Sequence, residues 1–166
     1  MMDSLESFGK SAAISVVTSK IGGGFANSGG AVSANMFGKT VVGTTLTKGL
    51  EITAKNVASS AINAVSVRGL LKGGKAFDTK AFVNGAFGKE AMAGVMAGMA
   101  GNAVSRSANV ALVDKNLLGF SADKIGNVAK LANTMGNLAS AGVSYGMTGR
   151  ATLNLLNMSM LGLKNR

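Results

Sequence analysis

The side chains that most often carry enzyme chemistry are scarce in this sequence. It has no His and no Cys, so a Ser–His dyad and thiolate coordination of zinc or an iron–sulfur cluster are both impossible. General acid–base catalysis would fall to carboxylates that are scattered along the chain: Asp3, Glu6, Glu51, Asp78, Glu90, Asp114 and Asp123. The sequence therefore predicts a non-enzymatic protein without catalytic, metal-binding or cofactor-binding residues. A Ser–Lys or Lys-only site is the alternative that residue counting leaves open.

Residues 33–40 (SANMFGKT) come within one residue of a phosphate-binding P-loop. That loop begins with Gly, so that its backbone amides can curl around a phosphate, but here Ser33 stands in the first position. The run VALVD, which ends at Asp114, imitates the strand and magnesium-binding aspartate of nucleotide-binding proteins. No alternation of strands and helices surrounds either motif. We therefore interpret the first as the start of a helix and the second as the end of one.

An all-α fold of Gly/Ala-rich packed helices, as a bundle or as helical hairpins, is predicted from composition and periodicity. The chain of 166 residues has no Pro, the residue that is least compatible with a helix interior. Apolar side chains recur at helical spacing within residues 54–71, 123–143 and 153–163, and Ser121 is a suitable N-cap for the second of these helices. Residues 40–52 are rich in Val and Thr, so a short β-hairpin is the alternative to a helix there.

Two regions are expected along the chain, and a single domain that comprises both is the alternative. Residues 1–71 make an N-terminal Gly-rich helical region, and residues 81–166 make a C-terminal helical region rich in small residues. The stretch 72–80 (KGGKAFDTK) between them has the composition of a linker. Glycine clusters at residues 22–24, 29–30 and 73–74 predict turns.

Small residues at helical spacing are the most specific feature of the sequence. Rows of such residues remove side chains from one stripe of a helix and let two backbones approach, either in a tightly packed protein or between helices in lipid. In water each Gly in a helix costs about 1 kcal/mol relative to Ala, so these helices need tertiary contacts or another solvent. The predicted helix-association residues are Ala93, Gly94, Ala97, Gly98, Gly101, Gly136, Ser140 and Ser144.

The formal net charge is +10, from 17 Lys and Arg against 7 Asp and Glu. The densest basic cluster, and the predicted basic surface, consists of Arg68, Lys72, Lys75 and Lys80. Most cations are single lysines without interleaved aromatic residues, so nucleic acid is an unlikely partner, whereas an anionic membrane fits the charge. The longest uncharged stretch, residues 131–149, is too polar to predict a stable membrane span.

Two segments carry a resemblance to a known group of proteins. Residues 141–157 (AGVSYGMTGRATLNLLN) resemble a segment of very large spirochaete surface proteins of the polymorphic-toxin type. Residues 82–88 (FVNGAFG), followed by Gly, Ala and Met, are similar to the small-residue helical regions that precede toxin domains there. The likeness lies within residues 77–163, and it implies a region upstream of a terminal effector that takes part in passage through the cell envelope.

We therefore expect a non-enzymatic helical packing or delivery module of a larger exported or surface-associated protein of the toxin type. Its partners would be other helices of the same or a larger chain, and a homo-oligomer is compatible with the rows of small residues. A cell-surface, exported or membrane-associated location is favoured, without a Sec signal peptide because the start of the chain is acidic. The first alternative is a basic glycine-zipper protein that permeabilises membranes by forming pores. The second is a small basic nucleic-acid-binding protein.

Overall fold

The computed structural model describes residues 2–28, 37, 39–72 and 74–149 and confirms the all-α fold class. The helices are α1 (Met2–Ser28), α3 (Val41–Ala64), α4 (Val67–Leu71), α5 (Thr79–Phe87), α6 (Lys89–Asn109), the π-helical turn η1 (Val110–Asp114) and α7 (Ala122–Thr148). The helix predicted over residues 153–163 and the glycine pair at residues 29–30 lie outside the described residues.

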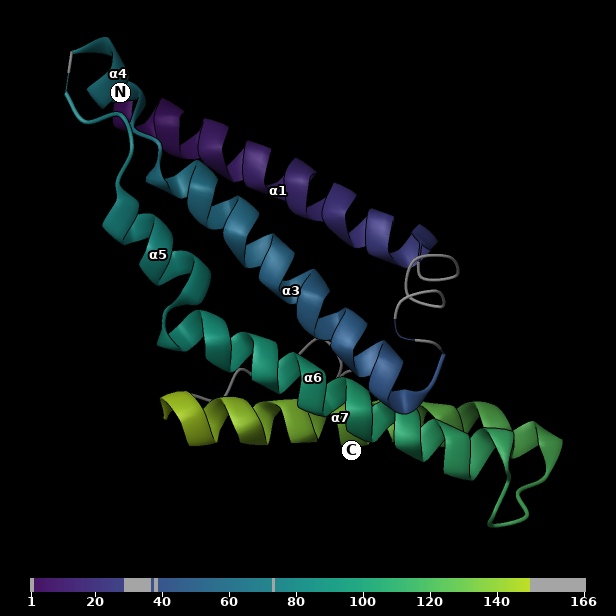
Figure 1. The fold of residues 1–166 in the computed structure, drawn as a ribbon. Helices are drawn as coiled ribbons and strands as arrows, with labels where there is room; N and C mark the ends of the chain where they lie inside the picture. Colours follow the sequence, from purple (N-terminus) through teal and green to yellow (C-terminus); the bar gives the residue numbers. More distant parts are fainter. Residues whose placement is uncertain (1, 29–36, 38, 73, 150–166) are drawn as a thin grey trace, which may run out of the picture.

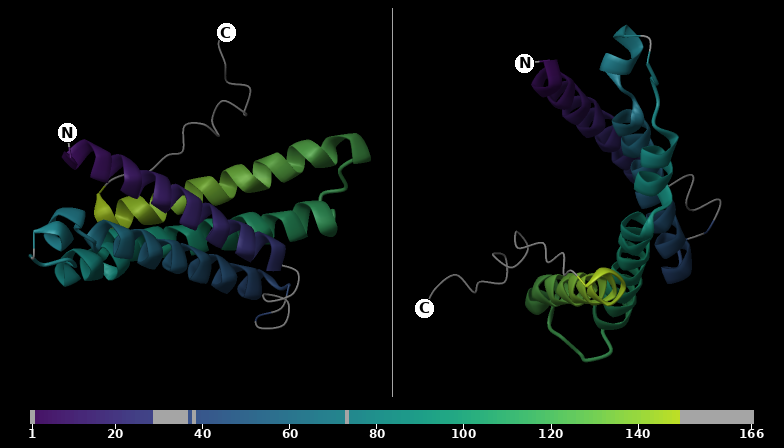
Figure 2. Two further views of the ribbon diagram at one scale, coloured as in Figure 1. Left: turned by 90° about the horizontal axis from the view of Figure 1, so that it is seen from above. Right: turned by 90° about the vertical axis from the view of Figure 1, so that its left-hand side faces the viewer.

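The helices form an open array rather than a closed bundle (Figure 1). Helix α3 is central, since it packs against α1, α5 and α6. Helix α7 runs back along α6 as the second arm of a hairpin and has its main contacts with α6 and η1. Figure 2 shows α1 and α7 at opposite edges of this array. Each edge helix therefore has its extensive contacts on one side only.

Helix α3 includes the Thr-rich residues 41–52, so the β-hairpin alternative for residues 40–52 is wrong. Thr40 caps the helix, because its Oγ1 accepts a hydrogen bond of 3.1 Å from the Gly43 N–H. The hydroxyls of Thr47 and Thr53 each donate to the carbonyl four residues earlier, at 2.9 Å. Threonine is accepted in this helix because its polar group finds a partner within the helix itself.

The helix predicted over residues 54–71 is interrupted at Val65, whose backbone is extended. Two long-range hydrogen bonds replace the helical ones: the Ser66 N–H donates to the Ala76 carbonyl at 2.9 Å, and the Asp78 N–H donates to the Ala64 carbonyl at 2.8 Å. These bonds close a lobe, residues 65–78, that carries α4. The stretch 72–80, expected to be a linker, thus comprises the returning arm of this lobe and the first two residues of α5.

The turn predicted at residues 22–24 is wrong, because α1 continues through it to Ser28. The Lys55 side chain of α3 lies against this part of α1: a Cβ added to Gly22 would be 3.0 Å from Lys55 Nζ. Because Gly22 has no side chain, Lys55 of the neighbouring helix can come close to α1. This packing contact offsets the low helix propensity of glycine.

Small residues fill the interior of the described part of the chain, and no large side chain there is fully buried. The buried positions are Gly43, Gly49, Ser60, Ala64, Ala86, Ala93, Val95, Ala97, Gly101, Val128, Ala132, Gly136, Ala141 and Ser144. Many large apolar side chains are exposed instead, among them leucines on α1, α3 and α7 and methionines on α6. Of the described helices, none has a stretch that is both long and apolar enough to cross a bilayer.

Candidate helix-association site

Helices α6 and α7 come into backbone contact where Gly101 faces Gly136. A Cβ built on Gly101 would lie 2.8 Å from the Gly136 carbonyl oxygen and 3.0 Å from Ser140 Cβ. A Cβ built on Gly136 would lie 2.5 Å from the Gly101 carbonyl oxygen and 2.6 Å from Ser105 Cβ. Neither position has room for a side chain, so these two glycines set the distance between the helices.

Rows of small residues extend from this crossing along both helices. Ala93 and Ala97 are buried on the turns of α6 that precede Gly101. On α7, Ala132 is buried one turn before Gly136, and Ser144 is buried two turns after it. We call this contact the α6–α7 seam, made of Ala93, Ala97, Gly101, Ala132, Gly136, Ser140 and Ser144. In the antiparallel hairpin, Ala93 and Ala97 lie level with the second half of α7, where Ser140 and Ser144 are.

The second row on α6, Gly94 and Gly98, does not belong to the seam. A Cβ on Gly98 would collide with Cδ1 of Ile52 on α3, and a Cβ on Gly94 would meet no atom within 4 Å. The structure therefore divides the predicted association residues. Gly101, Gly136 and Ser140 meet where α6 contacts α7, Gly98 faces α3, and Gly94 is exposed. Ala93, Ala97 and Ser144 are buried in the same rows.

Sequence reasoning missed two further close contacts, both on α3. A Cβ on Gly49 would be 2.6 Å from Met99 Sδ of α6, and a Cβ on Gly85 of α5 would be 2.5 Å from Ser60 Oγ. Both glycines stand within helices in place of a residue with higher helix propensity. A glycine within an otherwise helical run was the signal available in the sequence, but it does not identify which helix lies against it.

A polar groove of about 470 Å³ runs over the seam. The Ser105 hydroxyl donates to Asn133 Oδ1 at 2.7 Å and connects α6 with α7. The Thr45 hydroxyl donates to Asn102 Oδ1 at 3.3 Å and connects α3 with α6. These side-chain hydrogen bonds fix the rotation of each helix about its axis, which a row of small apolar residues alone would leave poorly specified.

One acidic side chain of α3 joins two lysines of the same helix. Glu51 forms ion pairs with Lys48 at 2.9 Å and with Lys55 at 2.5 Å. Partial burial acts to raise the pKa of Glu51, but the hydrogen bonds from Lys55 and Lys48 outweigh it and hold this pKa below its ordinary value of 4.5. Glu51 is therefore ionised at neutral pH and neutralises lysine charge beside α1.

The predicted basic surface lies on and next to the lobe of residues 65–78. Lys72 and Lys75 are exposed within the lobe, and Lys80 is exposed on the first turn of α5. Arg68 is part of α4, but its side chain is outside the described part of the structure. Asp78, at the end of the lobe, uses Oδ1 to accept a hydrogen bond from the Ala81 N–H at 2.9 Å and so caps α5.

Within the described ranges, no group of three or more His, Cys, Asp or Glu side chains is close enough together to hold a metal ion. The described helices α6 and α7 meet at a backbone contact, and side-chain hydrogen bonds connect α6 with α7 and with α3. Comparison with known protein families, with curated proteins and with solved structures finds no match for this chain.

Proposed function

We propose that this chain is a non-enzymatic helical packing module, and that the outward face of α7 receives a further helix. One observation carries this proposal. Leu131, Met135, Leu138 and Tyr145 are 50%, 43%, 60% and 61% exposed, and they follow one another at steps of four, three and seven residues. With the exposed Gly142 between the last two, they form a continuous stripe at the spacing of a coiled-coil seam. We call these five residues the α7 stripe.

The α7 stripe lies on the side of α7 away from Gly136 and Ser140, and it borders α6 at Met135, which lines a groove with Ala103 and Val104. Seam positions 132, 136 and 144 and stripe positions 131, 135, 138 and 145 fall on opposite sides of a helix with 3.6 residues per turn. Complete burial of a fully exposed Leu or Met side chain contributes about 1.5–3 kcal/mol, so each large stripe side chain, already about half buried, would contribute about half of that. An apolar stripe of this length on a monomer favours a binding face over an ordinary surface.

The resemblance of residues 82–88 and 141–157 supports the setting in which the module works. Of these segments, residues 82–88 lie in α5 and its C-cap and residues 141–149 form the end of α7 and its C-cap, while residues 150–157 lie outside the described residues. The two segments favour a larger exported or surface-associated protein of the polymorphic-toxin type, in which this helical module carries or precedes an effector. The partner helix would then come from the same larger chain or from a neighbouring copy.

Self-association of the isolated chain tests the proposal, because an unpartnered stripe pairs with the same stripe of a second copy. We expect wild-type protein to form dimers that dissociate on dilution, as measured by light scattering during gel filtration. The double variant Leu131→Glu/Leu138→Glu should remain monomeric. Leu117→Glu/Leu118→Glu is the matched control, since both leucines are exposed and lie outside the stripe. Equal masses for the two double variants would contradict the proposal.

A membrane-permeabilising function is the second candidate, and a different observation favours it. The lobe of residues 65–78 exposes Val67, Leu71 and Phe77 beside Lys72 and Lys75. Apolar side chains next to lysines are the combination that binds to anionic lipid surfaces. This candidate uses the lobe rather than the α7 stripe, so separate variants test the two.

A further inference from the structure

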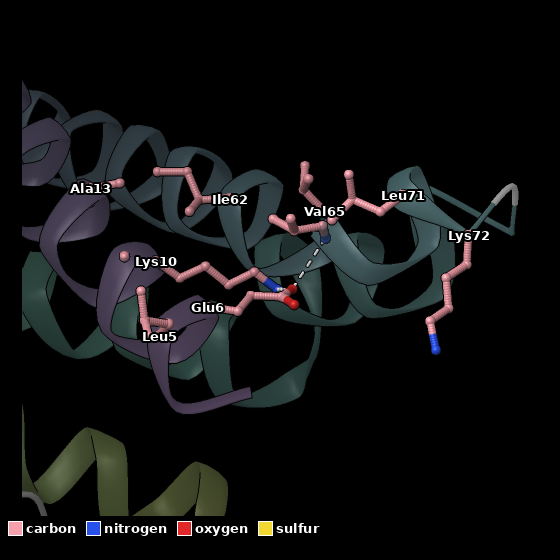
Figure 3. Close-up of a pocket in the computed structure, with 10 residues that line it drawn as sticks. Leu5, Glu6, Lys10, Ala13, Ile62, Val65, Leu71 and Lys72 are labelled. Atoms are coloured by element: carbon pink, nitrogen blue, oxygen red, sulfur yellow. Dashed lines mark hydrogen bonds and ion pairs between the residues drawn. The ribbon is translucent and has the colours of Figure 1, made fainter. Parts of the chain in front are cut away.

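A half-open apolar groove lies between the first turns of α1, the end of α3 and α4 (Figure 3). Its volume is about 610 Å³, which is within the range of small-molecule sites. Its walls are aliphatic: Leu5, Ala13, Ile62, Val65, Val67 and Leu71. Among the described residues that line the groove none is aromatic, so this lining presents flexible aliphatic walls and no flat ring surface.

The groove has one acid, and that acid is already used by the fold. Glu6 forms an ion pair of 2.8 Å with Lys10 and accepts a hydrogen bond of 3.2 Å from the Val67 N–H. Figure 3 shows these interactions in the middle of the groove. Glu6 and Lys10 neutralise each other, so Lys72 gives the described part of the lining a net positive charge.

Lys72 stands at one end of the groove, beyond Leu71, with its ammonium group away from the apolar walls (Figure 3). Its side chain is exposed. Among the described residues, no acid forms an ion pair with it. The groove thus combines an apolar channel with a single cation at its end.

We propose that this groove binds a single-chain fatty acid, with the alkyl chain along the aliphatic walls and the carboxylate at Lys72. A flexible alkyl chain suits walls that offer no aromatic ring, and the ammonium group of Lys72 complements the carboxylate. Leu5 and Leu71 are 71% and 69% exposed when the groove is empty, so an alkyl chain would remove large apolar side chains from water. The inference is independent of the proposed packing function, because no residue of the α7 stripe lines the groove.

Calorimetric titration of the full chain with dodecanoate, below its micelle concentration, tests the proposal. We expect saturable binding, and binding about tenfold weaker for dodecyltrimethylammonium, which has the same chain and the opposite charge. Lys72→Glu should weaken dodecanoate binding by about tenfold and remove this preference. Lys75→Glu carries the same charge change outside the groove lining and should have little effect.

Filling the groove provides a second test that does not depend on charge. Gly9 lines the groove, and a Cβ added there meets no atom within 4 Å. Gly9→Leu therefore keeps the helix and occupies the channel, so dodecanoate should bind about tenfold more weakly. Gly23→Leu is the matched control, because Gly23 also lies on α1 with open space and is outside the groove.

Three results would overturn the proposal: no binding of dodecanoate, equal binding by the Gly9 and Gly23 variants, or equal binding of both amphiphiles by wild-type protein. Binding that occurs only on vesicles of anionic lipid, and equally in both glycine variants, would show adsorption to a membrane surface and would also overturn it. The stripe variant Leu131→Glu/Leu138→Glu should bind dodecanoate like the wild type, so failure of the packing function is distinguished from failure of the groove.

Discussion

The contact of α6 with α7 depends on two glycines, Gly101 and Gly136, which have no side chain to keep the helices apart. Glycine in the middle of a helix lowers its stability by about 1 kcal/mol relative to alanine, so replacing such a glycine normally stabilises a helix. At Gly101 and Gly136 the facing backbone occupies the place of the side chain. Gly94 lies on the same helix as Gly101 and has open space around it. Two glycines of α6 should therefore respond in opposite directions to the same substitution.

We expect Gly101→Ala to lower the free energy of unfolding by roughly 1–3 kcal/mol, because the added methyl group overlaps the Gly136 carbonyl and forces the helices apart. Gly94→Ala should raise it by up to about 1 kcal/mol through helix propensity. Urea unfolding followed by far-UV circular dichroism measures both values. A Gly101→Ala protein as stable as Gly94→Ala would mean that the backbones do not meet at the seam.

Sequence spacing identified the residues of this contact but could not assign their partners. Ala93, Ala97 and Gly101 are separated by four residues, and so are Gly94 and Gly98. The two rows look alike in the sequence, although one faces α7 and the other faces α3 or open space. The difference depends on where neighbouring helices lie, which is a property of the tertiary structure.

At the scale of elements, the sequence predicted helices well and their limits less well. Ser121 was expected to precede a helix, and α7 begins directly after it, although the Ser121 side chain makes no capping hydrogen bond. The helix expected over residues 54–71 stops at Ala64, since Ser66 and Asp78 bond across the neck of the lobe. Such pairing between residues ten or more positions apart leaves no local pattern, so periodicity alone continued the helix past Val65.

The start of α5 offers a test of how the lobe is held. Asp78 has two roles there: its Oδ1 caps α5 through the Ala81 N–H, and its own N–H closes the neck at the Ala64 carbonyl. Asp78→Ala removes the cap and keeps the backbone bond, so we expect the free energy of unfolding to fall by about 1 kcal/mol. Asp78→Asn keeps a capping oxygen and should lose only a few tenths of this amount.

Amide hydrogen exchange separates this local effect from global unfolding. Exchange of the Ala81 N–H should accelerate in Asp78→Ala and stay near the wild-type rate in Asp78→Asn. Equal exchange rates in the two variants would show that the side-chain cap does not hold the start of α5.

The molecule as a whole combines a small-residue interior with an apolar and strongly basic exterior. Its open array leaves α1 and α7 with partners on one side only (Figure 2), and the net charge of +10 weakens, through mutual repulsion, any association between copies of the chain. Exposed apolar residues favour association, whereas the charge opposes contact with other basic surfaces. Partners with an acidic or apolar surface satisfy both conditions. Anionic lipid is one such surface, and the exposed lobe is where charge and apolar side chains coincide.

Two variants with the same change of net charge separate the role of the lobe at membranes from the effect of net charge: one carries Lys→Glu substitutions on and next to the lobe, and the other carries them elsewhere. Lys72→Glu/Lys75→Glu/Lys80→Glu changes the net charge from +10 to +4, because each substitution removes two charges. Lys115→Glu/Lys124→Glu/Lys130→Glu makes the same change at exposed positions outside the lobe. If the lobe binds lipid, the first variant should bind phosphatidylglycerol vesicles about a hundredfold more weakly and lose dye release, while the second should remain close to wild type at physiological salt.

An equal loss in both charge variants would attribute vesicle binding to the overall field of the protein and remove the lobe as a membrane site. Wild-type protein that neither co-sediments with these vesicles nor releases dye at low salt would rule out the membrane-permeabilising candidate altogether. A mobility-shift assay with DNA or RNA distinguishes polyanion binding from lipid binding. Nucleic acid offers phosphates to the lysines, but it has no apolar interior that could receive Val67, Leu71 and Phe77. If the lobe variant loses affinity for vesicles but not for nucleic acid, lipid binding depends on both the lysines of the lobe and the exposed apolar side chains beside them.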